Sequence, residues 1–208
     1  MYADDHLLVL GKPANLLAVP GRGDDKQDCL SRRVQALYPD ALIVHRLDMA
    51  TSGLLLMARS VDVQRALGKQ FEQRQVHKRY VAVVDGQLVN PDPLGGWQLI
   101  DLPIAADWPR RPLRVIAAVG KPSLTRWRAL AFDAQTDTTR VELEPVTGRS
   151  HQLRVHLQAI GHPIVGDALY APKAVQRKAQ RMLLHARALR FEHPALGRSM
   201  QFDSPPPF

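Results

Sequence analysis

Short apolar runs and helix-spaced apolar stripes alternate along this chain. The unbroken run Gly53–Ala58 is typical of a strand that is covered on both faces. Runs rich in β-branched and apolar residues predict the other strands. These strands are expected at His6–Leu10, Tyr80–Val84, Ser123–Phe132, Thr138–Leu143 and Leu184–Phe191.

Apolar residues spaced three or four apart predict three helices. The first spans Asp28–Tyr38, the second follows Ser60 as its N-cap, and the third spans Ser150–Ile160 and ends at Gly161. The residues expected to face the core are Leu30, Val34 and Leu37 in the first helix, Val63, Leu67 and Phe71 in the second, and Leu153, Leu157 and Ile160 in the third.

Strands and helices follow one another without a regular strand–helix–strand rhythm. The pattern therefore predicts an α+β fold with a mixed, largely antiparallel sheet and flanking helices. Asn90–Pro112 is rich in Pro and Gly and predicts irregular structure with short strands. At 208 residues, the chain is expected to form a single domain over 1–208.

Charge gives the first indication of a partner. Lys and Arg exceed Asp and Glu by 28 − 20 = 8, and a basic surface attracts polyanions such as nucleic acids. Cys29 is the only cysteine, the start MYADDHLLVL lacks the basic residues of a signal peptide, and no apolar run approaches the ~18 residues of a membrane span. We therefore expect a cytoplasmic protein.

The quartet His45-Arg46-Leu47-Asp48 places charge directly before the buried strand. Charge at that point costs solvation free energy unless it is paired or has a task. Taken alone, Asp48 is equally a turn residue or a cap for Thr51 and the residues after it. His45 is equally a packing or hydrogen-bonding side chain.

The third predicted helix offers a partner for Asp48. On a helical wheel His151, Arg154 and Gln158 share one face, apart from the apolar stripe. The turn before the helix adds Arg149 and backbone N–H groups. An arginine here can keep a carboxylate ionised. The alternative is an ordinary solvent-exposed polar face.

Four segments together resemble the RluA-type pseudouridine synthases. They are DDHLLVLGKPANLLAVPGR, HRLDMATSGLLLMA, KRYVAVV and GRSHQLRVHLQAIGHPIVGDALY, and the match runs from Asp4 to about Pro194. DLPIAADWPRRP most resembles the RluA subgroup, which modifies a large-subunit rRNA hairpin and the tRNA anticodon stem-loop. The departures are GKP at Gly11–Pro13 in place of NKP, and GRS in place of GRT. The resemblance leaves no room for a separate N-terminal RNA-binding domain.

The resemblance implies that the chain isomerises uridine to pseudouridine in RNA without a cofactor or metal. It implies that Asp48 is the catalytic carboxylate, that Tyr80 stacks on the target base, and that Arg154 pairs with the aspartate. It also implies that Arg46 helps to flip the nucleotide. The remaining candidate RNA contacts are Arg22, Arg149 and His151, with Arg110 and Arg111 ranked below them.

Chemistry on a stacked base requires that the base leave its stack, which is easiest in a loop. Asp48 is then a nucleophile towards the uracil ring or the sugar, or a base towards a sugar proton, and the sequence leaves these three routes open. Tyr80 taken alone is an ordinary sheet aromatic. We expect a monomer that acts on rRNA or tRNA stem-loops.

Two other functions compete with this one. A catalytically inactive RNA-binding or RNA-folding module would share the fold, although Asp48, Tyr80 and Arg154 are all present. A metal hydrolase using Asp48 and three histidines is the other. His151 and His156 lie five residues apart, about 140° around a helix, which counts against a shared metal. The three histidines are His45, His151 and His156.

Overall fold

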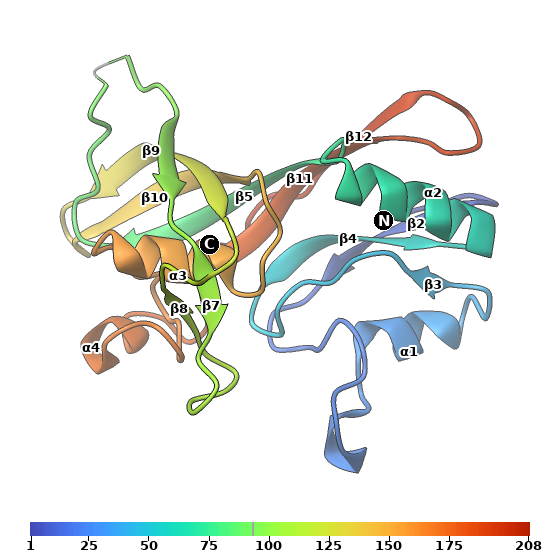
Figure 1. Cartoon of the computed structure of the whole chain (residues 1–208), viewed down its shortest axis with the longest axis horizontal. Coiled ribbons are helices and arrows are strands. Elements are labelled where there is room, and N and C mark those ends of the chain that lie inside the picture. Colours follow the sequence, from blue (N-terminus) through green and yellow to red (C-terminus); the bar gives the residue numbers. More distant parts are fainter. Residues whose placement is uncertain (93) are drawn as a thin grey trace. The chain divides into compact units, whose positions relative to one another are not determined.

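The computed structural model describes residues 1–92 and 94–208 and divides the chain into two compact units. The first unit comprises residues 1–78 and 185–207, and the second comprises residues 79–184 and residue 208. Figure 1 labels most of the elements. The first unit contains β1 (Tyr2–Ala3), β2 (Leu7–Lys12), a 3-10 turn (Asp24–Lys26), α1 (Leu30–Gln35), β3 (Leu42–Ile43), β4 (Ser52–Ala58), α2 (Val61–Glu72), β11 (Leu184–Glu192) and β12 (Ser199–Asp203).

The sheet of the first unit has β4 at its centre. The strand order is β1-β2-β4-β11-β12, and β3 pairs with the far end of β4. β11 runs parallel to β4, where His185 lies opposite Ser52, and the other pairs in this unit are antiparallel. All seven residues of β4 are buried, as its unbroken apolar run predicts.

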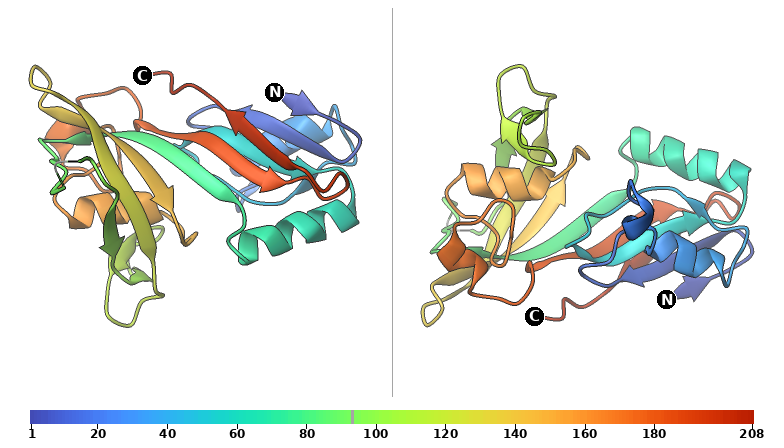
Figure 2. Two further views of the ribbon diagram at one scale, coloured as in Figure 1. Left: turned by 90° about the horizontal axis from the view of Figure 1, so that it is seen from above. Right: turned by 90° about the horizontal axis from the view of Figure 1, so that it is seen from below.

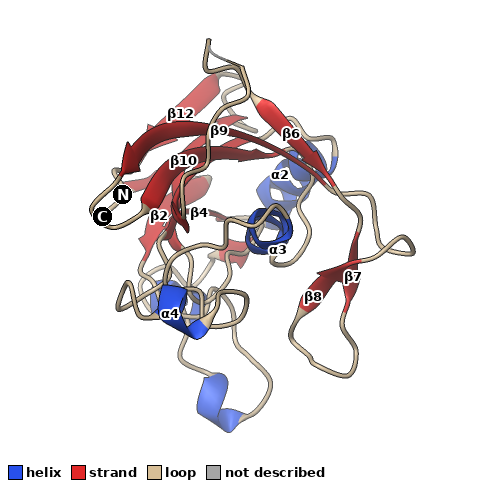
Figure 3. Cartoon of the chain, turned by 90° about the vertical axis from the view of Figure 1, so that its left-hand side faces the viewer, coloured by secondary structure: helices blue, strands red, loops and turns tan. Residues whose placement is uncertain are grey.

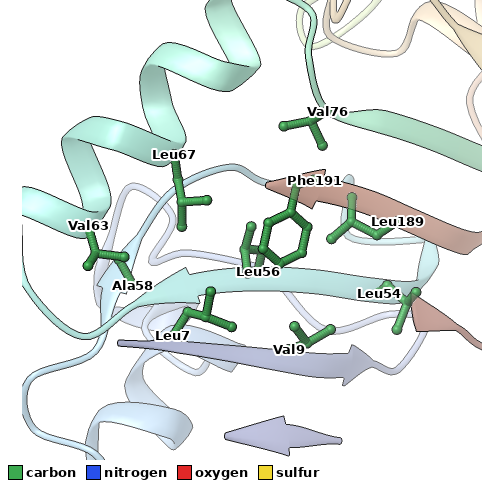
Figure 4. Close-up of a cluster of buried hydrophobic side chains, with 10 residues drawn as sticks. All are labelled: Leu7, Val9, Leu54, Leu56, Ala58, Val63, Leu67, Val76, Leu189 and Phe191. Carbon is green, nitrogen blue, oxygen red and sulfur yellow. The ribbon is translucent and has the colours of Figure 1, made fainter. Parts of the chain in front are cut away.

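Helix α2 covers one face of this sheet (Figures 1 and 2). The Ser60 hydroxyl accepts a hydrogen bond from the Val63 N–H at 3.3 Å, which confirms the predicted N-cap. Figure 4 shows Val63 and Leu67 of α2 pointing towards β-strand side chains. The buried cluster comprises Leu7, Val9, Leu54, Leu56, Ala58, Val63, Leu67, Val76, Leu189 and Phe191.

Close approach of β4 and β11 depends on Gly53. Its φ of 114° lies in the region that side chains disfavour, and an added Cβ would overlap the Ala186 carbonyl. The strand that follows the Asp48 loop therefore requires glycine at this position to pair closely with β11.

A buried histidine links the start of the chain to the turn between β11 and β12. His193 is fully buried, and its Nε2–H donates to the Asp4 carboxylate at 3.0 Å. Burial raises the pKa of Asp4. This effect is outweighed by hydrogen bonds that lower the pKa, and the net result is a pKa of about 2. The donors are the Tyr2 hydroxyl, the backbone N–H groups of His6 and Leu7, and His193. The ionised carboxylate is thus part of the folded structure.

The second unit is built on an antiparallel sheet with strand order β5-β10-β9-β6. β5 begins at the end of the first unit, and β7 and β8 form a separate hairpin. The elements are β5 (His77–Asp85), β6 (Gln98–Asp101), β7 (Ile104–Ala106), β8 (Arg114–Ile116), β9 (Leu124–Asp133), β10 (Thr138–Pro145), α3 (Gln152–Ala159) and α4 (Lys173–Gln176).

Helix α3 contacts β8 as well as β9 and β10, and Figure 3 shows the β7–β8 hairpin standing apart from the longer strands. Six consecutive residues of α3, from Gln152 to Leu157, are buried. The expected apolar stripe holds for Leu153 and Leu157, while Ile160 is half-buried. The alternative of a solvent-exposed polar face is wrong at Arg154, which is 4% exposed.

Most predicted elements are confirmed, with shifted ends. The first helix is shorter than the predicted Asp28–Tyr38, so Leu37 lies beyond its end and is 78% exposed rather than in the core. The third helix begins at Gln152 rather than Ser150, because His151 adopts the left-handed conformation with φ of 58°. β12 was not predicted. The irregular segment Asn90–Pro112 contains two short strands, and its position 93 lies outside the described residues.

The mixed α+β class with a largely antiparallel sheet is confirmed. In the described part of the chain, no helix has the length and apolar character needed to cross a membrane.

Candidate active site

Asp48 lies in the loop that joins β3 to β4 in the first unit. It is half-buried between buried Leu47 and exposed Met49. The Thr51 N–H donates to the Asp48 carbonyl at 3.1 Å and closes a turn just before β4. The turn interpretation of Asp48 is therefore correct for its backbone, and the turn presents its carboxylate at the start of a rigid strand.

His45 anchors the other end of this loop. Its Nε2 accepts the Leu56 N–H at 3.0 Å, and its ring stacks on Phe71 with centroids 4.7 Å apart. Burial and the nearby Lys78 ammonium lower the pKa of His45 to about 3. The ring is neutral at physiological pH, so His45 is a packing and hydrogen-bonding residue here.

Lys12, at the end of β2, ties the loop to the sheet. The side chain is 2% exposed, and its Nζ donates to the carbonyls of Pro13, Leu16 and Met49 at 2.8, 2.8 and 3.0 Å. Burial lowers the pKa of Lys12 to about 8, and attraction to Asp48 partly opposes that fall. A buried ammonium group therefore holds the Asp48 loop in place through its hydrogen bond to the Met49 carbonyl.

The sequence interpretation missed this role of Lys12. The residue stands in the quoted GKP motif, and the only available signal was a lysine at the end of the otherwise uncharged run LLVLGK. A lysine at such a place is buried only when its three donors are satisfied.

Arg154 lies on α3 in the second unit and is paired with Asp167. Its Nε and Nη2 donate to the two carboxylate oxygens at 2.7 and 2.6 Å. The two side chains are 5% and 0% exposed. This is the bidentate geometry that arginine commonly forms with a carboxylate. Asp167 belongs to the quoted GDALY segment, but no role was predicted for it.

Tyr170 completes the surroundings of Arg154. The guanidinium carbon lies 4.9 Å from the centroid of the Tyr170 ring. The Tyr170 hydroxyl lies 2.6 Å from Nδ1 of His151 and accepts the Arg114 N–H at 2.9 Å. The structure thus brings His151 and Arg154 together, as the helical wheel predicts, with Tyr170 between them.

Tyr80 occupies β5, opposite Leu143 of β10, and is half-buried. Asp48 and Arg46 belong to the first unit, whereas Tyr80 and Arg154 belong to the second. The assembly of these residues into one site, including the Arg154–Asp48 pair, therefore stays a prediction.

The candidate RNA contacts differ in how far they are engaged. Arg22, Arg46 and Arg149 are exposed, and Arg149 donates from Nε to the Pro122 carbonyl at 3.4 Å. Arg110 is paired with Asp107 at 2.6 Å, and Arg111 lies 3.5 Å from the centroid of the Trp108 ring. The exposed arginines are available to phosphates, whereas Arg110 is largely neutralised.

The histidines of the metal-hydrolase alternative are engaged elsewhere. Nδ1 and Nε2 of His156 lie 2.9 and 3.0 Å from Thr125 Oγ1 and the Leu102 carbonyl, and burial lowers the His156 pKa. Among the described residues no group of three or more His, Cys, Asp or Glu side chains is arranged to hold a metal ion.

Comparison with known proteins identifies the family of this chain. The model of the RNA pseudouridylate synthase family matches residues 6–159. The chain belongs to this family. The RluA-type resemblance is confirmed, and so is the prediction of an isomerase that modifies RNA. Neither the non-catalytic module nor the metal hydrolase is supported.

Curated relatives match this synthase over all or nearly all of its length. It is 47% identical over 209 residues to the dual-specificity RNA pseudouridine synthase RluA of Escherichia coli strain K12, covering 100% of this chain and 93% of the relative. The protein of the same name from Yersinia pestis is 44% identical over 203 residues, covering 97% of this chain and 96% of the relative.

Solved structures agree with the fold of this synthase. Human RNA pseudouridylate synthase domain containing 1 is similar with a TM-score of 0.82 and 28% identity, over 100% of this chain and 82% of the human chain. Human RNA pseudouridylate synthase domain containing 4 shares the fold with a TM-score of 0.75 at 24% identity, over 99% of this chain and 87% of the other.

Proposed function

We propose that this synthase converts specific uridines to pseudouridine in stem-loops of large-subunit rRNA and tRNA, with Asp48 as the catalytic carboxylate. The proposal is supported by the dual-specificity relatives and by the Asp48 loop. A half-buried carboxylate in a closed turn, next to the Met49 carbonyl that the buried Lys12 ammonium holds, is positioned to react.

The isomerisation needs no external redox partner. The N1–C1′ bond of the target uridine breaks, the uracil turns, and C5 bonds to C1′, after which C5 loses its proton and N1 gains one. Asp48 acts on the uracil ring or on the sugar in this sequence, and Tyr80 offers a ring face to the flipped base. Chain residues therefore supply positioning, a carboxylate and a stacking surface.

We propose that the two compact units form one catalytic domain over 1–208 and that Arg154 pairs with Asp48. The bonds to Asp167 use the Nε–Nη2 edge of the guanidinium. Arginine carries five donors in a fixed fork, so the Nη1 edge can serve a second carboxylate. We also propose that the enzyme works as a monomer in the cytoplasm.

The test is tritium release from RNA labelled at C5 of uridine, because C5 loses its hydrogen only when the base is rejoined there. Large-subunit rRNA and tRNA are offered separately, with Asp48→Asn as the matched control. Release by the wild type and none by Asp48→Asn is expected. Turnover by Asp48→Asn would refute the role of Asp48, and no release from either RNA would favour the non-catalytic module.

The pairing of Arg154 has its own test. Arg154→Ala leaves Asp167 buried without its partner and is expected to destabilise the fold by about 3–5 kcal/mol. Arg154→Lys keeps the positive charge but cannot form the bidentate hydrogen bonds of a guanidinium. Turnover is therefore compared at equal folded concentration, measured by circular dichroism, and both variants should lose most activity. Near-normal turnover of folded Arg154→Lys would refute the need for the fork.

A further inference from the structure

A cavity of about 560 Å³ lies in the second unit, between the β7–β8 hairpin and the turn before α3. Its volume falls within the range of about 300–1,000 Å³ that is typical of ligand sites. Arg114, Lys121 and Arg149 line it together with Trp108, and none of its described lining residues is acidic. The cavity therefore suits an anion that carries a flat ring.

The cationic walls of the cavity are held in place by the backbone. The N–H groups of Ile104 and Lys121 donate to each other's carbonyls at 3.0 and 2.9 Å, which fixes Lys121 beside β7. On the opposite wall, the buried Gln152 side chain accepts the Arg149 N–H at 3.0 Å and the Thr147 hydroxyl at 2.7 Å. A ligand thus meets a site that is largely preorganised.

Arg114 contributes an unsatisfied donor. Its Nε is buried and has no hydrogen-bond partner among the described residues. Leaving a buried donor unsatisfied is costly. Arg114 also lines the cavity, so its guanidinium charge is available to attract a phosphate there. The backbone N–H of Arg114 donates to the Tyr170 hydroxyl, so the cavity wall shares Tyr170 with the Arg154–Asp167 pair.

Trp108 provides the flat surface. The residue is 67% exposed, and the Arg111 guanidinium carbon lies 3.5 Å from the centroid of its ring. Arg111 covers one ring face, and Trp108 remains largely exposed at the cavity. An exposed aromatic ring beside cations is the arrangement by which proteins stack single-stranded bases.

We propose that this cavity binds one RNA nucleotide other than the target uridine. Its base stacks on Trp108, and its phosphate contacts Arg114, Lys121 and Arg149. The inference rests on the proposed function, because it takes the same RNA as its ligand. The cavity holds a loop nucleotide that has left its stack, so it reads the opened shape of the loop rather than the duplex stem.

The experiment measures binding of the tRNA anticodon stem-loop to full-length protein in the Asp48→Asn background, where turnover is removed. Trp108→Ala is expected to weaken binding about 5- to 150-fold, as for other stacked bases, and Trp108→Tyr to restore most of it. Lys121→Ala should lower the slope of log affinity against log salt by about 0.7–0.9, while the exposed control Lys173→Ala on α4 should not.

A scan with abasic nucleotides identifies the stacked base. At one loop position other than the target, an abasic residue should weaken binding to protein with Trp108 and have no further effect on Trp108→Ala. Additive losses at every position, or equal affinity of Trp108→Ala and its parent, would overturn the inference. Tritium release by the wild type tests the proposed function separately. If the wild type releases tritium but binding does not depend on Trp108, only the nucleotide site in the cavity is refuted.

Discussion

Lys12→Met tests how the buried ammonium group that binds the Asp48 loop affects stability and its dependence on pH. The ordinary pKa of 10.5 falls to about 8 in the folded protein. That difference corresponds to about 3 kcal/mol between the two protonation states. The unfolded chain binds the proton more tightly, so the free energy of unfolding should rise by up to about 3 kcal/mol between pH 8 and 10.5.

The methionine variant lacks this rise. It also leaves three backbone carbonyls without their donor, at about 1–3 kcal/mol for each that stays unsatisfied, which opposes the gain from removing a buried charge. The pH dependence is therefore a sharper signature than the stability at one pH. Turnover should fall about 10- to 100-fold, because Met49 loses the tether that positions the neighbouring Asp48.

The assay is urea unfolding of both proteins at several pH values between 7 and 10.5, with tritium release measured at equal folded concentration. Lys69→Met, an exposed residue of α2, is the control for replacing a lysine. The difference in unfolding free energy between wild type and Lys12→Met should grow across the pH window. A difference that stays constant would refute the account of a buried ammonium.

The remaining predictions concern the first unit. Leu67→Ala should lower the free energy of unfolding by about 2–5 kcal/mol in denaturant titrations, since Leu67 is fully buried in the α2 cluster. Asp4→Asn should remove about 2 kcal/mol at neutral pH, and the wild type should lose the same contribution as pH falls from about 4 to 2; equal acid unfolding of both proteins would contradict this. Gly53→Ala should destabilise the protein strongly or prevent folding, whereas Gly68→Ala, in α2 with open space around its Cβ position, should be neutral or stabilising by thermal melts.

Local sequence patterns predicted those helices and strands well whose structure is determined by residues adjacent in sequence. The apolar run of β4 and the Ser60 cap are examples, because each depends on neighbours in sequence. Leu37 failed because the helix ends before it, and helix length is set by packing that a periodic pattern does not contain.

The polar contacts of the site were less predictable, because long-range partners decide them. Arg154 was placed on the correct helix, but its pairing with Asp167 depends on a turn that returns thirteen residues later. Lys12 shows the same limit, since its bond to Met49 joins residues 37 positions apart. A sequence motif can point to such residues, but only the fold shows what they touch.

The buried Arg154–Asp167 pair also bears on how this protein can be altered by selection or design. Changing either residue alone passes through an intermediate with one uncompensated interior charge, whereas an uncharged pair of similar volume is often tolerated at such places. The two positions are therefore expected to change together rather than one at a time. A combinatorial library screened for folding should vary them jointly, because single-site saturation would hide any joint replacement that is neutral for stability.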